Sequence, residues 1–351
     1  MPSFLKKEDA ILLYSKIYDF DNLLEAYKNT QKGNRKYKNE SLVFRPFYLS
    51  NLKQIQEELR LGTYIPSDYI SFYVHEPKER LIHAPTLRDK IVQFSTHKVL
   101  QDIYEPVFYK HSYACLLGRG QHRAAKRVQR NLHINPNRWI IKIDVKKFFY
   151  SINRDILKKV LRKKIRCLIL LNHLDKIIDS SPCGDKGIPL GNVTSQDFAN
   201  ILLNEVDQYI TRYLGIRYYV RFMDDLILVV NSKKEAQENL VKIKNFLYSR
   251  LDLETNNKTK IFPVKQGVNA YGYKIYKNHM KLRDSSKNKM KRKIRKMDQK
   301  LENSEITLKE VQQSVSSWIG HAKHANSYGL IIHIFKDYPY LETITIEKGD
   351  T

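Results

Sequence analysis

Residues 219–230 read YVRFMDDLILVV, so two adjacent carboxylates lie between two runs of strand-forming residues. This pattern predicts a hairpin with Asp224 and Asp225 at its turn. A solvated surface turn is the ordinary place for such a pair. The unbroken apolar run at 226–230 instead favours a buried strand. Acids held at the end of buried strands repel each other unless a cation lies between them, so the stretch raises the possibility of a metal site.

A third acid lies in residues 139–152, which read WIIKIDVKKFFYSI. If this is a strand, Lys142 and Asp144 share the face opposite its isoleucines. Alone, such an acid is more often a structural residue. Because adjacent strands lie about 5 Å apart, Asp144 could share a pair of divalent ions with Asp224 and Asp225. Nucleotidyl transfer uses two Mg²⁺ ions about 3.5–4 Å apart, and substrate phosphates and water complete the shell of this ion.

The charge of the chain indicates a polyanionic partner. The sequence has 62 Lys plus Arg and 37 Asp plus Glu, a formal net charge of +25. Such an excess favours nucleic acid. Anionic lipid is the alternative, but the charge is spread along the chain rather than gathered on one amphipathic helix. Basic residues interleaved with 23 tyrosines fit a channel that stacks bases and follows phosphates.

Other features of composition indicate a folded protein. A hydrophobic content of 42% excludes a wholly disordered chain. The three cysteines are widely spaced and no secretory signal is evident, so we expect reduced thiols and a cytoplasmic location. No apolar run approaches the roughly 20 residues that span a bilayer, so no membrane partner is expected.

The pattern along the chain favours an α+β or α/β core. Residues 20–31 and 49–62 have helical periodicity, 69–85 read as two strands around a turn, and 87–104 read as an amphipathic helix. Strand and helix then alternate as far as residue 276. From Lys287 the spacing predicts a strongly basic helix with one buried stripe, formed by Met290, Ile294, Met297 and Leu301.

Several stretches, in order, resemble one known family. Residues 141–152 (IKIDVKKFFYSI), 187–207 (GIPLGNVTSQDFANILLNEVD) and 219–230 resemble palm motifs A, B and C of reverse transcriptases. The resemblance covers nearly the whole chain. Residues 76–93 and 111–124 resemble finger segments of these enzymes, 253–267 resembles motif D, and 270–277 resembles the primer-gripping hairpin.

Within the family, the chain most resembles the enzymes of diversity-generating retroelements. Its motif B reads Gly191-Asn-Val-Thr-Ser195-Gln196, and residues 316–330 also look like that group. Compact bacterial reverse transcriptases of phage defence share much of this pattern, so both types stay open.

The resemblance implies an α+β right-hand polymerase with an antiparallel catalytic sheet. Fingers would lie mostly in residues 1–135, a palm with finger insertions in 136–280, and a helical thumb in 281–351. The implied activity is that of an RNA-directed DNA polymerase, the Mg²⁺-dependent addition of dNTPs to a primer 3′-hydroxyl on an RNA template.

The resemblance also assigns the metal ligands. Asp144 and Asp224 would bind both Mg²⁺ ions, Asp225 would be a supporting ligand, and Val145 would offer its backbone carbonyl. Phe149, five residues after Asp144, falls where the family places the aromatic side chain that excludes a 2′-hydroxyl. A core phenylalanine is the alternative, and the neighbouring Phe148 is the better candidate for the core.

The resemblance also implies contacts with the substrate. Gly191 would let the backbone approach the nucleotide and template. The Gly/Pro-rich loop at 187–196 is followed by a helix, which we expect to be capped near Thr194 or Ser195. Leu190 stands where many relatives have glutamine, and a leucine can discriminate only by shape.

Basic residues would contact the phosphates. Lys78 and Arg80 are candidates for binding the triphosphate, Arg88 is a weaker one, and surface charge is the alternative for all three. Lys258 matches the motif D lysine proposed to protonate pyrophosphate, with Lys260 as the competitor.

The implied partners are template RNA, a DNA product or primer, and dNTPs. We expect no RNase H, endonuclease or maturase-sized region after the thumb, and hence dependence on a dedicated structured RNA and on an accessory protein. The role could be mutagenic copying in a diversity-generating retroelement or phage defence with cDNA from a non-coding RNA. An idle RNA-binding protein of polymerase shape is a third alternative, against which the three intact aspartates argue.

Overall fold

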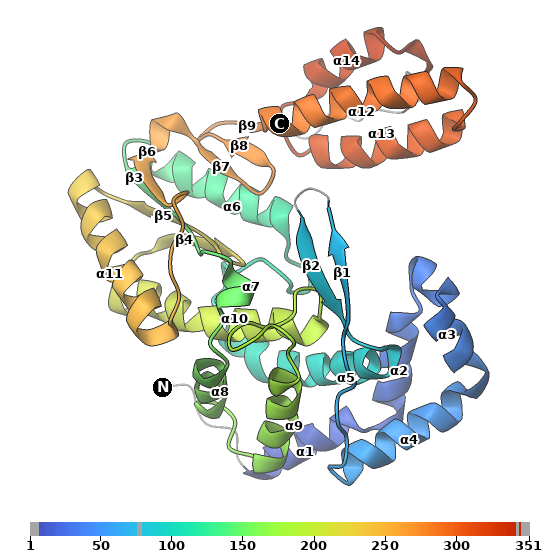
Figure 1. Cartoon of the computed structure of the whole chain (residues 1–351). Coiled ribbons are helices and arrows are strands. Elements are labelled where there is room, and N and C mark those ends of the chain that lie inside the picture. Colours follow the sequence, from blue (N-terminus) through green and yellow to red (C-terminus); the bar gives the residue numbers. More distant parts are fainter. Residues whose placement is uncertain (1–6, 76–78, 342–343, 345–351) are drawn as a thin grey trace. The chain divides into compact units, whose positions relative to one another are not determined.

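The computed structural model describes residues 7–75, 79–341 and 344 (Figure 1). The chain forms two compact units, each assembled from three separate stretches. Unit 1 contains residues 1–110, 144–215 and 241–256, and unit 2 contains residues 111–143, 216–240 and 257–351. The helix α11 (Lys233–Leu251) passes from unit 2 into unit 1.

Unit 1 is organised around one central helix, α5 (Leu87–Tyr104), which packs against α1, α2 and α10. The side chain of Thr86 begins this helix by accepting a hydrogen bond from the Asp89 amide. Buried residues occur on every side of α5, which is typical of a core helix. The other elements are α1 (Lys7–Ile17), α2 (Phe20–Thr30), α3 (Asn39–Phe44), α4 (Tyr48–Arg60), the antiparallel hairpin of β1 (Ile70–Val74) and β2 (Arg80–Ala84), α7 (Phe148–Ser151), α8 (Arg154–Arg162), α9 (Leu168–Asp179) and α10 (Val193–Gln208).

Unit 2 contains a four-stranded sheet in the order β4-β5-β3-β6. β4 (Tyr218–Phe222) and β5 (Asp225–Val230) form an antiparallel hairpin, and β3 (Trp139–Asp144) runs antiparallel to β6 (Lys260–Pro263). The division between the units falls one residue before the end of β3. The helix α6 (Gln121–Ile134) packs on β4 and β5.

The rest of unit 2 is a three-stranded sheet followed by three helices. β7 (Val268–Ala270), β8 (Tyr273–Ile275) and β9 (Met280–Leu282) form the sheet. Helices α12 (Asp284–Glu302), α13 (Leu308–Ala322) and α14 (Tyr328–Lys336) lie together beyond it (Figure 1). One buried apolar cluster runs from α6 through both sheets into these helices. The cluster includes Val128, Val220, Ile227, Tyr273, Ile294, Val315 and Ile334.

Most of the predicted elements are confirmed. Helices occur at α2, α4 and α5, a hairpin occurs at β1–β2, and α12 buries Met290, Ile294 and Met297, with Leu301 half-buried. Two local predictions are wrong. The helix at 87–104 was expected to be amphipathic, but α5 is buried on every side because it packs against α1, α2 and α10. The helix after motif B was expected to be capped near Thr194 or Ser195, but its N-cap is Asn192, which makes no side-chain capping hydrogen bond. The mixture of helices with antiparallel sheets is the α+β architecture that was predicted. The described ranges contain no helix with the length and apolar character needed to cross a bilayer.

Unit 1 also contains a buried histidine, His173 of α9. Its ring is 4% exposed, its Nε2 lies 2.9 Å from the Thr96 hydroxyl, and the rings of Tyr14 and Tyr64 contact it. Burial, with a smaller contribution from the charge of Lys176, lowers the pKa of His173 to about 3. The folded protein therefore keeps this imidazole neutral at pH values where the unfolded chain protonates it.

This burial predicts an acid-sensitive stability. The unfolded state binds a proton at His173 that the folded state does not bind. The free energy of unfolding should therefore fall as pH drops from about 6.5 toward 3, by up to about 1.4 kcal/mol per pH unit. The free energy of unfolding in urea, measured between pH 7 and 5, should depend less steeply on pH in His173→Gln than in wild type. A residual slope is expected, since burial also lowers the pKa of His122, His321 and His324. Identical slopes in both proteins would refute the assignment.

Candidate active site

The turn between β4 and β5 carries the paired acids. Phe222 pairs with Asp225 across the hairpin, Met223 has a left-handed φ of 50°, and Asp224 completes the turn. Arg221 beneath it is fully buried: its amide donates to His111 O, 3.0 Å away, and its guanidinium donates to Met223 O, 3.4 Å away. The turn is therefore held over a buried positive charge.

Asp225 has a basic partner on the neighbouring strand. Lys142 of β3 places its Nζ 3.4 Å from Asp225 Oδ1, and the same ammonium donates to Asn269 O at 2.8 Å. Since Lys142 is two residues before the end of β3, this ion pair locates that end of β3 beside the beginning of β5. The sequence predicts that Lys142 and Asp144 share one face of the strand, but it does not predict the ion pair between Lys142 and Asp225.

A buried tyrosine also faces Asp225. The ring of Tyr271 lies 5.2 Å from that of Phe222, and its hydroxyl makes no hydrogen bond to any described residue. Burial, followed by the negative charge of Asp225, raises the pKa of Tyr271 well above its usual value, and Arg221 opposes this shift. Tyr271 therefore remains a neutral phenol beneath the acidic turn.

Asp144 is the last residue of β3, and motif D holds it. The Asn256 amide donates to Asp144 O at 2.9 Å, and the Asn256 side chain donates to Asp144 Oδ1. Val145 is buried and forms an antiparallel bridge with Thr255. Asn256 was not among the predicted site residues. Its only sequence signal is its place in the motif D stretch.

The three aspartates at these strand ends offer oxygen donors, the type of ligand that a hard divalent ion takes. Within the described part of the chain, no three His, Cys, Asp or Glu side chains are placed to hold a metal ion by themselves. Asp144, Asp224 and Asp225 offer carboxylate oxygens, and a hard ion such as Mg²⁺ commonly takes one or two carboxylates and completes its shell with phosphates and water. Asp144 in unit 1 and Asp224 and Asp225 in unit 2 therefore each offer the type of donor that such an ion takes.

Phe149 lies against the motif B loop. Phe148 is buried, whereas Phe149 is half-buried, and their rings are 5.5 Å apart at 62°. Ile188 N donates to Phe149 O at 2.9 Å, and Gly187 N donates to Ile152 O at 2.7 Å. These two hydrogen bonds join the loop to α7 and to Ile152, the residue that follows it. Phe148 is a core residue, as predicted, and the role of Phe149 stays a prediction.

Two glycines shape the motif B loop. Gly187 has a φ of +98°, and a Cβ there would lie 3.0 Å from the Tyr150 backbone. Gly191 has a φ of +106°, and the atom nearest to a Cβ built there would be Ile82 Cγ2, 3.8 Å away. The backbone at Gly191 therefore has room for another group to approach it closely. Leu190, half-buried, precedes it in the turn that leads into α10.

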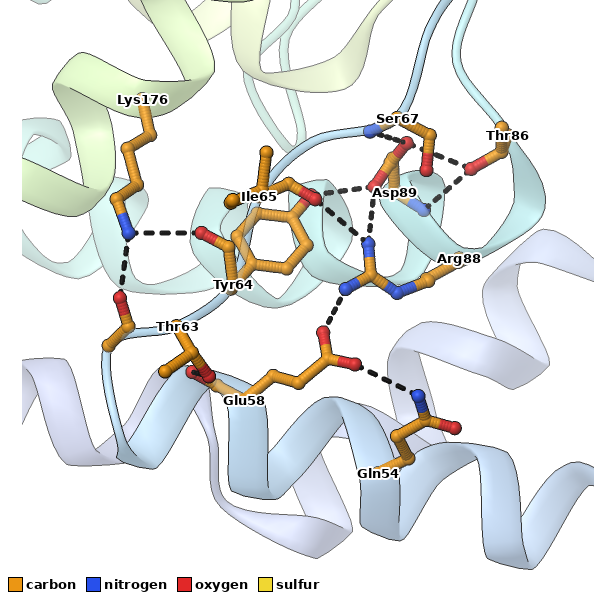
Figure 2. Close-up of polar contacts among 11 residues, drawn as sticks. Gln54, Glu58, Thr63, Tyr64, Ile65, Ser67, Thr86, Arg88, Asp89 and Lys176 are labelled. Carbon is orange, nitrogen blue, oxygen red and sulfur yellow. Dashed lines mark hydrogen bonds and ion pairs between the residues drawn. The ribbon is translucent and has the colours of Figure 1, made fainter.

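The finger candidates differ in their surroundings. Arg80 is exposed at the beginning of β2, and Lys78 lies outside the described residues. Arg88 instead belongs to a polar network, shown in Figure 2, in which it contacts Glu58, Ile65 O and Asp89. The guanidinium of Arg88 therefore has carboxylate partners within unit 1. Its part in binding the triphosphate stays a prediction.

Asp89 is the buried centre of this network. It accepts hydrogen bonds from the Tyr64 hydroxyl at 2.8 Å, the Ser67 amide at 3.0 Å and the Thr86 hydroxyl at 2.8 Å (Figure 2). Because its carboxylate is satisfied on several sides, we assign it a structural function.

The remaining candidates, Lys258 and its competitor Lys260, are both exposed. Lys260 is the first residue of β6 and Lys258 lies just before it. Both line one cavity in unit 2.

One family model matches this chain, and several known proteins are similar to it. The family described as "Reverse transcriptase (RNA-dependent DNA polymerase)" matches residues 75–275, more than half of the chain. YkfC of Escherichia coli K12 is 27% identical over 271 residues, which cover 64% of this chain and 71% of YkfC. The group II intron-encoded protein LtrA of Lactococcus lactis is 26% identical over 231 residues, 62% of this chain and 38% of LtrA. A structure of telomerase from Candida albicans, solved with a TWJ fragment of telomeric RNA, covers 87% of this chain and 58% of its own at 13% identity and a TM-score of 0.48.

Proposed function

The chain belongs to the reverse transcriptase (RNA-dependent DNA polymerase) family, and from this premise we propose that it copies a dedicated RNA into DNA. The main support is the arrangement of two adjacent strands. β3 ends at Asp144, its neighbour β5 begins at Asp225, and the contact between Lys142 and Asp225 joins them. The formal charge of +25 supports a nucleic-acid partner.

In this proposal the three aspartates bind divalent ions. Asp144 and Asp224 hold two ions, Asp225 supports them, and Val145 contributes its carbonyl. Mg²⁺ is the ion we propose, because all the donors are oxygens. When bound, such ions lower the pKa of the primer 3′-hydroxyl and neutralise the leaving pyrophosphate.

The other residues act on the nucleotide. Phe149 excludes a 2′-hydroxyl, Gly191 gives the backbone room beside the template, and Arg80, with Lys78, binds the triphosphate. Lys258 donates a proton to the departing pyrophosphate, whose oxygens become more basic as the bond breaks.

A primer-extension assay tests the activity. Purified protein with a primed RNA template, dNTPs and Mg²⁺ should elongate the primer, and EDTA should stop the reaction. A matched DNA template shows whether RNA is preferred. A protein that binds the primed RNA tightly but extends no primer with Mg²⁺ or Mn²⁺ would instead be an RNA-binding protein of polymerase shape.

For the biological role we propose mutagenic copying in a diversity-generating retroelement. The support is motif B, with Gly191 followed by Ser195 and Gln196. Phage defence with cDNA made from a structured non-coding RNA is the second candidate, because the compact defence enzymes share this pattern. In both cases an accessory protein is a further proposed partner.

Leu190 leads to a prediction about copying accuracy. A side chain that hydrogen-bonds near the nascent pair can penalise wrong geometry, whereas leucine acts only by shape. One such contact is worth roughly 1–3 kcal/mol, or about 5- to 150-fold in discrimination. Leu190→Gln should therefore lower the misincorporation rate, with some loss of speed.

Deep sequencing of cDNA copied from one RNA by both proteins measures this effect. Errors concentrated at template adenines in the wild-type products would favour the retroelement role, and evenly low errors would favour defence. Superimposable error spectra for wild type and Leu190→Gln would remove this residue from the account of fidelity.

A further inference from the structure

The motif B loop is held at its first end by backbone hydrogen bonds. The amides of Gly187 and Ile188 donate to backbone oxygens of α7 and of the residue after it. Gly191, near the other end, has a left-handed φ of +106°, and a glycine leaves its backbone many conformations. The position of Leu190 and Gly191 therefore also depends on what holds the far end of the loop.

Asn192 holds this far end in an unusual way. It is the N-cap of α10 and is only 2% exposed. An asparagine at this position usually accepts a hydrogen bond from an amide in the first turn of its own helix, and Asn192 makes no such bond. Its side-chain amide instead donates to the Tyr69 hydroxyl at 2.9 Å. The side chain of Asn192 is therefore used for a distant contact rather than for its helix.

Tyr69 is half-buried and directly precedes β1. Burial raises the pKa of its phenol, and hydrogen bonds with Ser180, Asn192 and Gln93 oppose that shift. Ser180 is the C-cap of α9, and Gln93 lies on α5. The Tyr69 hydroxyl is therefore a junction that joins α5 and α9 to the beginning of α10.

The segment that carries Tyr69 is itself held in place (Figure 2). The Ser67 amide donates to the Asp89 carboxylate at 3.0 Å, and the Tyr64 hydroxyl donates to the same carboxylate at 2.8 Å. From α9, the Lys176 ammonium donates to Tyr64 O at 3.0 Å. All of these residues belong to unit 1. Because Tyr69 follows a fixed segment, its hydroxyl can hold its partner in a defined position.

We propose that Tyr69 is a positioning residue for motif B. Its hydroxyl fixes Asn192, and Asn192 fixes the adjoining backbone of Leu190 and Gly191. The inference rests on the proposed function, in which this backbone lies beside the incoming nucleotide and the template. It goes further than that function, because it gives Tyr69 and Asn192 a part in nucleotide binding although neither touches the nucleotide through its side chain.

Amide hydrogen exchange without nucleic acid tests the contact itself. Tyr69→Phe removes the hydroxyl and keeps the ring. One net hydrogen bond corresponds to a change of about 2- to 12-fold in an equilibrium constant, so exchange in residues 187–198 should become faster by about that factor. Asn192→Ala should accelerate the same amides. In the Asn192→Ala background, Tyr69→Phe should have almost no further effect on this loop, because the hydrogen bond is already absent.

Tyr14→Phe is the matched control. Tyr14 is also buried in unit 1, and its hydroxyl donates to Leu59 O at 2.7 Å, on α4 rather than in motif B. The loss of this hydroxyl should lower the free energy of unfolding. Exchange in residues 187–198 should stay within about two-fold of wild type, because local opening of the loop does not involve Tyr14.

Steady-state primer extension tests the consequence for the nucleotide. A loosened loop should bind the nucleotide less well in the ground state and in the transition state alike. Tyr69→Phe should therefore raise KM for dNTPs by about 2- to 12-fold and leave kcat nearly unchanged. Affinity for primed RNA depends on the basic residues and should stay within about two-fold of wild type. Tyr14→Phe should alter neither constant.

The two measurements can fail separately. Unchanged exchange in both Tyr69→Phe and Asn192→Ala, or equal acceleration in Tyr14→Phe, would show that Tyr69 does not hold the loop. Faster exchange with an unchanged KM in an active enzyme would overturn the positioning role. A protein that extends no primer would overturn the proposed function instead, and hydrogen exchange would still decide whether Tyr69 holds the motif B loop.

Discussion

Replacing Asp224 by Asn should reduce primer extension by several orders of magnitude and leave RNA affinity within a few-fold of wild type. The substitution keeps the size of the side chain but removes the charge that attracts a divalent ion. RNA binding depends on the many lysines and arginines, so it should persist. Asp144→Asn should behave in the same way. Single-turnover extension and RNA titration on the same preparations measure the two effects separately.

Asp179→Asn is a suitable control for this experiment. Asp179 ends α9 and forms an ion pair with Lys158 at 2.5 Å, with 56% of its side chain exposed. The same chemical change there should leave extension nearly unaltered, because an exposed pair contributes little. An Asp224→Asn protein that polymerises at close to the wild-type rate would overturn the metal assignment.

Replacing Phe149 by Val or Ala should greatly increase the use of ribonucleotides relative to dNTPs. Phe149 is half-buried, and its backbone oxygen accepts a hydrogen bond from the Ile188 amide of the motif B loop at 2.9 Å. Shortening the side chain opens space beside the 2′ position without removing that backbone hydrogen bond. The ratio of kcat/KM for rNTP and dNTP, measured with one template base, reports the change.

Phe148 provides the matched comparison for this prediction. It is only 3% exposed, so Phe148→Ala should act on stability, by about 3–5 kcal/mol, rather than on sugar choice. If Phe149→Val still polymerises DNA with unchanged sugar discrimination, another residue excludes the 2′-hydroxyl.

Local patterns in the sequence predicted much of this fold. Thr86 and the apolar spacing of α5 are local signals, and so is the apolar run of β5, because each acts within a few residues along the chain. The strand that ends at Asp144 and the turn at Asp224 were predicted for the same reason. The roles of the site residues stay predictions.

Pairings between distant residues were not predictable in this way. Asn256 holds Asp144 across 112 residues, and Lys142 reaches Asp225 on a strand that follows much later. Nothing near Asn256 or Lys142 in the sequence specifies these partners. The N-cap of α10 was missed for a different reason. Thr194 and Ser195 are good capping residues, but the helix begins before them, so both lie in its first turn and are buried.

The interleaved construction of the two units has a consequence for synthesis on the ribosome. Unit 1 is complete only when residues 241–256 have been added, and unit 2 only when residues 257–351 have been added. Neither unit can therefore fold from its first stretch alone. Loop closure over such separations is slow, and partly made chains expose apolar surface in the meantime. Nascent chains should therefore depend on chaperones until residues 257–351 have been synthesised. Halves obtained by cutting the gene at one position should not fold as independent proteins.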